Sequence, residues 1–273
     1  MGATDILILL LAGFGASTVN ALAGGGSLIT FPTLVGVGLA PVAANVTNSL
    51  GVSPGYVASV VGSRRDLADL SRRRGRRELL GLVPTAIVGT AAGCALLLAT
   101  PERAFVVVVP FLVLGATTVL AFQQRLKARV ARLSNADLPR ATPMPREAST
   151  ERSPRSRVVL HAVVGLGCFY GGYFGAALGV MLVAALGLVL DESLRHITAL
   201  KNAISAVSGL TTVVAFSLFA PVDWVAVMVL APATIAGGYA GARLVTRLPA
   251  PLLRALIVTV GTVVGVIFLI RAF

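Results

Sequence analysis

Charged residues are scarce in this sequence of 273 residues, where Asp, Glu, Lys and Arg together make up 12%. A soluble domain carries about 25% charged residues. Hydrophobic residues instead make up 56%, and the mean hydropathy is +0.89. With so few charges to cover a water-exposed surface, the composition excludes an ordinary soluble domain. It predicts a polytopic membrane protein whose main partner is the lipid bilayer.

Cysteine and histidine are also scarce, with two of each in the chain. Cys94 and Cys168 lie within apolar stretches, which argues against a disulfide framework and favours small core residues. His161 and His196 lie at the ends of apolar stretches, where a structural role is favoured over proton relay. The apolar stretches lack paired carboxylates, clustered metal ligands and a Ser/His/Asp set. We therefore expect no enzyme activity, no metal and no cofactor.

Basic residues are concentrated in two places. Of the 23 Lys and Arg residues, 16 fall in the polar segments 64–77 and 125–157. Basic residues spread over a surface would indicate nucleic acid, but basic loops between apolar spans are typical of the cytoplasmic side of a membrane protein. We therefore expect no nucleic-acid partner. A specific site for anionic lipids is the alternative use of these segments.

The apolar stretches are long enough to cross a membrane, since a hydrocarbon core about 30 Å thick needs about 20 helical residues. We predict spans at 5–22, 27–39, 42–62, 79–99, 104–122, 158–176, 178–190, 197–219, 224–243 and 252–271, of which the second and seventh are short. The expected fold class is an all-α polytopic membrane protein with about 8–10 transmembrane segments. Ala21-Leu22-Ala23 resembles a signal-peptidase site, but no Lys or Arg precedes it, so we keep the first span in the mature chain.

The two halves of the sequence resemble each other. PTAIVGTAAG at 84–93 matches PATIAGGYAG at 232–241, and Asn48 in VTNSL aligns with Asn202 in LKNAI. The glycine cluster of the first half falls opposite two glycines of the second: Gly24, Gly25 and Gly26 against Gly175 and Gly179. These matches indicate an internal duplication.

The charges of equivalent loops predict that the two halves are inverted. The loop 63–78 holds seven Arg and should be cytoplasmic, whereas its counterpart at 220–223 holds no base. The next pair is reversed, with one Arg at 100–104 and three at 243–254. Inverted repeats need an odd number of crossings in each half, and five satisfy that condition. We predict a first transmembrane repeat at 1–122, a flexible basic cytoplasmic linker at 123–157 and a second transmembrane repeat at 158–273.

Glycines interrupt the apolar stretches at 24–26 and at 175–179. Glycine weakens a helix, and irregular backbone within a membrane is tolerated where it lines a polar cavity. In inverted-repeat transporters, broken helices present backbone N–H groups and positive helix ends to an anion. We therefore predict an anion site between the two breaks, with close helix packing as the alternative explanation. Packing is favoured for the pairs Gly89 and Gly93, and Gly237 and Gly241.

Polar residues within the spans are few, and buried polar groups in a membrane are usually functional. The predicted substrate-binding residues lie at or near the two breaks: Asn20, Gly24, Gly25, Gly26, Ser27, Thr47, Asn48, Ser49, Tyr173, Gly175, Gly179, Lys201, Asn202 and Ser205. Lys201 is the one base that we place inside a span, where it could neutralise an anion. The alternative is a lysine that extends to the cytoplasmic interface.

The motifs NALAGGGSLITFPTL and NVTNSLG, with GGYFGAALGVMLVAALGL and ALKNAIS in the second half, resemble the TauE/SafE family of sulfite-exporter-like permeases. The resemblance covers nearly the whole chain outside the linker, although the second half lacks an equivalent of Pro32. It implies secondary transport of small sulfur-containing anions, such as sulfite, sulfoacetate or other organosulfonates, across the bacterial inner membrane.

Export is the expected direction of transport. The chain has no Gly-rich nucleotide-binding loop with Lys-Ser/Thr, so an ion gradient or the gradient of the anion itself is the expected energy source. Two other functions stay open: a membrane assembly factor without transport, and an importer of a different small anion. A homodimer is an assembly that the sequence leaves open.

Overall fold

The computed structural model describes residues 2–22, 25–136, 154–176, 178–190, 192–244 and 250–272. Eleven helices and no strand make up this part of the chain. Five helical segments are long and apolar enough to cross a membrane: Ala3–Ala21, Arg76–Ala99, Glu102–Val119, Arg195–Phe219 and Trp224–Gly241. The protein is therefore an all-α polytopic membrane protein, as the composition predicts.

Each of the ten predicted spans corresponds to a helix. The first half contains α1 (Ala3–Leu22), α2 (Ser27–Gly36), α3 (Pro41–Gly62), α4 (Arg64–Arg74), α5 (Arg76–Ala99) and α6 (Glu102–Ala136). The second half contains α7 (Pro154–Tyr173), α8 (Leu178–Val189), α9 (Leu194–Phe219), α10 (Trp224–Leu244) and α11 (Ala250–Ala272).

Two predictions about the polar segments need correction. The segment 63–78 is not a loop, because residues 64–74 form α4. This helix has Asp66 in its first turn and arginines in its last, which suits the helix dipole, and Leu70 is fully buried. The linker is also shorter than predicted, since α6 continues to Ala136 and α7 begins at Pro154. Residues 137–153 lie outside the described part.

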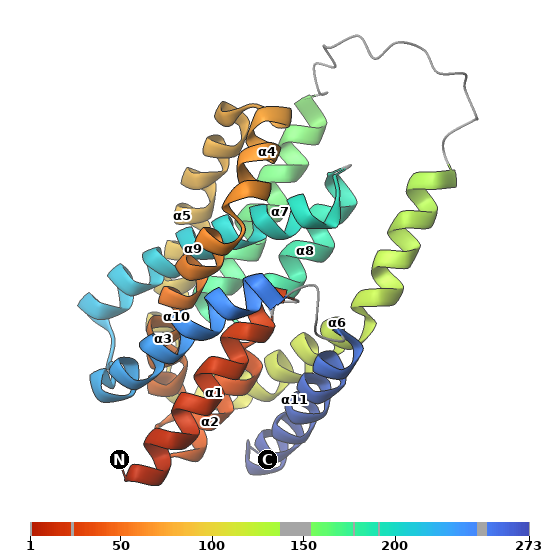
Figure 1. Cartoon of the computed structure of the whole chain (residues 1–273). Helices are drawn as coiled ribbons and strands as arrows, with labels where there is room; N and C mark the ends of the chain where they lie inside the picture. The colour runs from red at the N-terminus through yellow and green to blue at the C-terminus, as the bar shows by residue number, and fades with distance from the viewer. Residues whose placement is uncertain are drawn as a thin grey trace, which may run out of the picture.

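Figure 1 shows both termini at one end of the helix bundle and α4 at the opposite end. The ends of α6 and α7 that border the linker also lie toward the α4 end. The α1–α2 pair lies toward the termini, whereas the α7–α8 pair lies toward α4. Helix α4 and the linker-side ends of α6 and α7 thus lie at the same end of the bundle.

The helices pack in corresponding pairs. Helix α1 of the first half packs along α10 of the second, and α7 of the second half packs along α5 of the first. The short helices follow the same scheme, since α2 contacts α1 and α3, while α8 contacts α7 and α9. Two further pairs, α3 with α9 and α6 with α11, join equivalent helices of the two halves.

Glycines allow the closest of these contacts. A Cβ atom at Gly93 would overlap the carbonyl oxygen of Phe169 in α7, and one at Gly237 would overlap that of Phe14 in α1. Gly89 and Gly241 approach the backbones of Gly165 and Thr18 in the same way. The packing role predicted for these four glycines is therefore confirmed.

An aromatic cluster fixes the helices around the breaks. Phe31 of α2 meets Phe174, which follows α7, edge to face with 5.2 Å between ring centroids. Phe105 of α6 and Phe268 of α11 pack on these rings at 6.3 and 5.8 Å. Burial of such rings provides a large hydrophobic contribution, so packing of the aromatic cluster stabilises the helices next to both breaks.

Candidate anion site between two helix breaks

The two breaks have the same backbone design. At the first, Gly25 lies between α1 and α2 with φ +88°, and at the second, Gly175 lies between α7 and α8 with φ +74°. The following helix begins with the same bond, from the Leu28 N–H to the Gly25 carbonyl (3.0 Å) and from the Leu178 N–H to the Gly175 carbonyl (3.3 Å). A positive φ is costly for any residue with a Cβ atom, so both positions require glycine.

The other predicted glycines have different structural roles. A Cβ atom at Gly26 would overlap the carbonyl oxygen of Ala16, so this residue allows α2 to start against the backbone of α1. Gly179 lies within α8, so the second break is shorter than the predicted 175–179. Gly24 lies outside the described residues. Backbone conformation and packing thus explain Gly25, Gly26 and Gly175, and their predicted contact with an anion stays a prediction.

A long helix of the opposite half donates a hydrogen bond to the end of each broken helix. Lys201 of α9 donates from Nζ to the carbonyl oxygen of Asn20 near the end of α1 (2.9 Å). Asn45 of α3 donates from Nδ2 to the carbonyl oxygen of Tyr173 at the end of α7 (3.0 Å). These carbonyls belong to the last turns, where no intrahelical donor is available. The first break is therefore capped by a cation and the second by a neutral amide.

Lys201 is completely buried. The alternative of a lysine that extends to the membrane interface is therefore wrong. Its ammonium lies at the negative end of the α1 dipole, which favours a cation and offsets part of its desolvation. The same charge lies beside the backbone turn that begins α2.

A small polar cavity lies between the two breaks. Its volume is about 20 Å³, which is room for about one water molecule. Ser27 and Gly175 contribute from the breaks, and Ser49, Tyr56, Ser208 and Thr212 contribute polar groups from α3 and α9. The remaining lining residues are Val52, Gly171, Leu178 and Gly209. An oxyanion is larger than one water molecule, so the cavity must widen before it can admit one.

Two helix faces carry these polar groups with the same spacing. On α3 the face reads Asn45, Ser49, Val52 and Tyr56, and on α9 it reads Lys201, Ser205, Ser208 and Thr212. Residues at i, i+4, i+7 and i+11 share one face of a helix. Sequence reasoning selected Ser49, Lys201 and Ser205 but missed Asn45, Tyr56, Ser208 and Thr212. The matching spacing in the two halves is the signal that could have found them.

The polar groups of this region are tied to one another. The Tyr56 side chain is hydrogen-bonded to Ser27 at the start of α2. Thr90 of α5 donates to the Ser208 hydroxyl at 2.9 Å. On the second break, the Tyr170 hydroxyl donates to the Ala176 carbonyl at 2.7 Å. These contacts hold the cavity wall and both breaks in place.

Three predicted residues bind neighbouring segments and do not line the cavity. The Thr30 hydroxyl donates to Asn48 Oδ1, which joins α2 to α3. Thr47 Oγ1 accepts a hydrogen bond from the Asp223 N–H just before α10 (3.1 Å). Asn202 Nδ2 donates to Ser63 Oγ just before α4 (3.2 Å). Asn20 and Tyr173 contribute main-chain oxygens to the caps described above, and Ser205 is buried on the polar face of α9.

An ionic network joins the halves at the α4 end. Arg74 of α4 contacts Glu192, which precedes α9, at 2.9 Å, and Glu78 of α5 at 3.3 Å. His196 of α9 contacts Asp69 of α4 through Nε2 (2.9 Å) and Glu192 through Nδ1 (3.2 Å). The Arg74 side chain is only 3% exposed. His196 thus takes part in structural contacts between α4 and α9, and His161 Nδ1 lies 2.7 Å from Thr85 Oγ1 between α7 and α5.

The pKa of the Asp69 carboxyl is lowered in this network. Desolvation acts to raise it, but the hydrogen bond and charge of Arg73, followed by those of His196, outweigh desolvation. The carboxylate form is therefore the one that α4 and α9 stabilise.

Comparison with known proteins identifies the family. The family model described as Sulfite exporter TauE/SafE matches residues 9–268. The probable membrane transporter protein YfcA of Escherichia coli (strain K12) is 26% identical over 261 residues, which cover 94% of this chain and 86% of that protein. A probable membrane transporter protein of Haemophilus influenzae is 26% identical over 262 residues, covering 94% and 92% of the two chains. No solved structure matches significantly. This multi-pass protein of the bacterial inner membrane therefore belongs to the TauE/SafE sulfite exporter family of membrane transporters.

Proposed function

We propose that this chain is a secondary transporter that exports small sulfur-containing anions, such as sulfite, sulfoacetate or other organosulfonates, by alternating access. The observation that carries the proposal is the polar cavity between two helix breaks, with the buried ammonium of Lys201 at the first break. Helix starts and a nearby cation stabilise an anion. The family description, a sulfite exporter, supports the class of substrate.

Alternating access between two halves is simplest when the halves are inverted repeats, which we also propose. The corresponding helix pairs and the two glycine breaks support a duplicated architecture. The placement of α1–α2 toward one end of the bundle and α7–α8 toward the other supports its inversion (Figure 1). Substrate sites of such transporters lie near the midplane, at the interface between the repeats.

The ionic network at the α4 end is the proposed gate on that side. Its Arg74–Glu192 and Asp69–His196 contacts join the first half to the second. These contacts must separate before the halves can move apart at this end. On the segment equivalent to α4, the Asp223 carboxylate accepts a bond from the Ala226 N–H of its own helix (2.9 Å).

Anion counterflow in proteoliposomes tests the proposed function. Vesicles containing the purified protein are loaded with unlabelled sulfite or sulfoacetate, and entry of the labelled anion is followed. We expect transient accumulation for accepted anions and none in vesicles without protein. Absence of counterflow for every sulfur-containing anion, with the protein folded, would contradict the proposal and favour an assembly factor. Coupled inward flux in vesicles of known orientation would instead favour an importer.

A further inference from the structure

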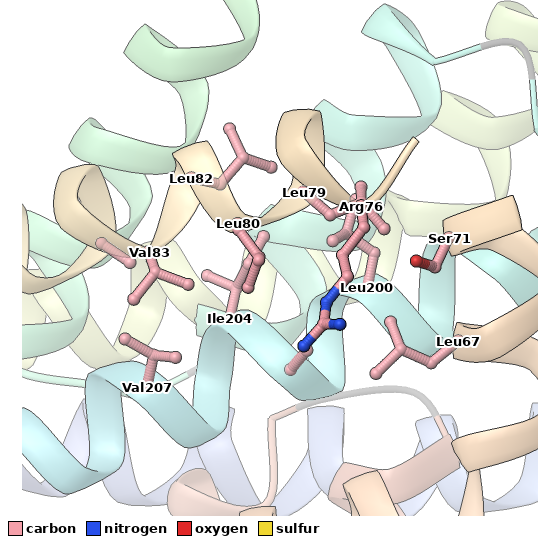
Figure 2. A pocket seen from close by; sticks show the side chains of 12 residues that line it. Leu67, Ser71, Arg76, Leu79, Leu80, Leu82, Val83, Leu200, Ile204 and Val207 are labelled. Carbon is pink, nitrogen blue, oxygen red and sulfur yellow. The ribbon is translucent and has the colours of Figure 1, made fainter. Parts of the chain in front are cut away.

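An apolar groove opens between α4, α5 and α9 (Figure 2). Its volume is about 210 Å³. Ten of its twelve lining residues are Leu, Ile, Val or Ala, and the two others are Ser71 and Arg76. Leu80 at its edge is 54% exposed, on a helix that is apolar enough to cross the membrane. The groove therefore faces the lipid and carries one cationic side chain.

The groove exists because α5 and α9 lack the close contact of the corresponding pair, α10 and α3. There, a Cβ atom at Gly51 would lie 2.8 Å from the Leu230 Cβ, and one at Gly55 would lie 2.8 Å from the Thr234 carbonyl oxygen. In the groove, side chains such as Val83 and Val207 face each other (Figure 2), and no glycine lines it. Bulkier residues keep the two helices apart and leave room for a ligand.

Arg76 is placed to bind the polar end of such a ligand. It is the first residue of α5, and its side chain is exposed. Figure 2 shows its guanidinium beside α9, near Leu200 and Ile204. Within the described residues the Arg76 side chain has no hydrogen bond or ion pair, whereas the side chains of Arg73 and Arg74 are paired with acids. Five N–H donors are thus available next to an apolar surface.

The charge distinguishes this groove from two other cavities in the described part of the bundle. Two larger apolar cavities of about 590 and 450 Å³ occur in the described part of the chain, between α3, α9 and α10 and around α7 and α8. Neither has a charged residue in its lining. A neutral hydrocarbon chain suits all three cavities, but an anionic amphiphile suits only the groove with Arg76.

We infer that this groove binds an anionic phospholipid of the leaflet on the α4 side of the bundle. An acyl chain would lie against the leucines of α5 and α9, and the phosphate would accept hydrogen bonds from Arg76 and Ser71. Arginine binds phosphate oxygens in a bidentate manner, and a free phosphate ion would gain nothing from the apolar wall. The bound lipid would bridge the two halves beside the ionic network. The inference does not depend on which anion is transported.

Native mass spectrometry of the full chain tests the site, with phosphatidylglycerol and phosphatidylcholine of the same acyl chains as probes. We expect the wild-type protein to prefer phosphatidylglycerol. Arg76→Gln should weaken phosphatidylglycerol binding about fivefold, the effect of about 1 kcal/mol for one arginine near an anionic lipid. Arg77→Gln is the matched control, because Arg77 is exposed in the same turn but does not line the groove. It should bind both lipids as the wild type does.

A second variant tests the apolar part of the site. Ala203→Phe places a ring in the groove and should weaken the binding of both lipids. Equal losses in Arg76→Gln and Arg77→Gln would indicate diffuse attraction and overturn the inference, as would equal binding of the two lipids. Displacement of phosphatidylglycerol by an equal concentration of inorganic phosphate would show an anion site without lipid specificity and would also overturn it. The melting temperature of each variant without added lipid verifies its folding.

Discussion

Lys201 combines two physical roles that can be separated by mutation. Its Nζ donates to the Asn20 carbonyl, so it completes the end of α1, and its charge lies at the first break. A helix cap needs only a donor, whereas attraction of an anion needs the charge. The corresponding contact at the second break uses the neutral amide of Asn45. An uncharged donor is therefore sufficient to cap a broken helix in this fold.

We expect Lys201→Gln and Lys201→Met to differ in stability but not in anion affinity. Both remove the charge and should weaken anion binding by about 1.5–3 kcal/mol, the value of a hydrogen bond to a charged group. Only Met also removes the donor to Asn20, which should lower the melting temperature. Lys201→Arg should retain part of the affinity. The measurements are substrate-induced thermal stabilisation and counterflow; wild-type affinity in Lys201→Gln would restrict this lysine to capping.

Gly25 offers a test of the backbone at the first break. Gly25→Ala places a Cβ atom on a residue with φ +88°, at a cost of about 1–2 kcal/mol, and should distort the turn that begins α2. Gly15→Ala is the matched control, because a Cβ atom at this helical glycine of α1 meets nothing within 4 Å. We expect lower thermal stability and lower counterflow for Gly25→Ala alone. Equal behaviour of the two variants would contradict a conformational role for Gly25.

At the scale of the elements, the buried side chain of Arg74 attaches α4 to the second half. Arg74→Gln removes the partner of Glu192 and should destabilise the protein by about 3 kcal/mol. The neighbouring Arg73 forms an exposed pair with Asp69 within the same helix, at 62% and 48% side-chain exposure. Arg73→Gln should therefore cost less than about 1 kcal/mol. Hydrogen exchange of α4 measures both effects, and similar losses of protection would contradict the gate assigned to Arg74.

Acidification provides a second test of this attachment. The pKa of Asp69 is lowered in the folded protein, so its contribution is present above the ordinary value of 3.8 and is lost as the pH falls through the folded value. The groups that face Asp69 are Arg73 on its own helix and His196, which also contacts Glu192. We expect exchange of α4 amides, corrected for intrinsic rates, to rise in this acid range. Asp69→Asn should remove the part of this change that depends on the carboxylate. If the pH profile of α4 exchange were the same in Asp69→Asn as in the wild type, the role assigned to the Asp69 carboxylate would be contradicted.

The order of the helices could be predicted because each membrane span corresponds to a run of apolar residues in the sequence. The two short helices were found in the same way, since glycines interrupt those runs at Gly25 and Gly175. The helix α4 was missed because it has no apolar run, and its buried face depends on Leu70 and on contacts with α9. The helical extension of α6 to Ala136 was missed for the same reason.

The candidate site could be predicted only in part, because burial shows that a polar residue is constrained but not where its side chain points. Thr47 and Asn202 are as buried as the cavity residues, yet they bind the segments before α10 and α4. Lys201 was correctly placed inside a span. Its partner is the main-chain carbonyl of Asn20, and every residue has such a group, so the sequence could not identify this contact. Contacts between the halves of the fold decide these details.

For the whole molecule, the proposed inversion of the two halves predicts on which side of the membrane each loop lies. The positive-inside rule places α4 in the cytoplasm because of its arginines. The equivalent segment at 220–223 lacks basic residues, so inversion places it in the periplasm. If the repeats were parallel, the two segments would share one side. Their locations therefore decide between the two architectures without any assumption about the substrate.

Single-cysteine labelling can decide this in intact cells. In a background with Cys94→Ala and Cys168→Ala, we expect a membrane-impermeant maleimide to label Pro221→Cys in intact cells, but Arg72→Cys only after permeabilisation. Both positions are exposed, so access to them depends on the side of the membrane rather than on burial. Arg103→Cys is the control, because it lies at the exposed start of α6 in the other segment predicted to be periplasmic. Labelling of positions 72 and 221 from the same side would contradict the inverted repeat. It would also contradict the proposal that two inverted halves open the cavity to each side of the membrane in turn.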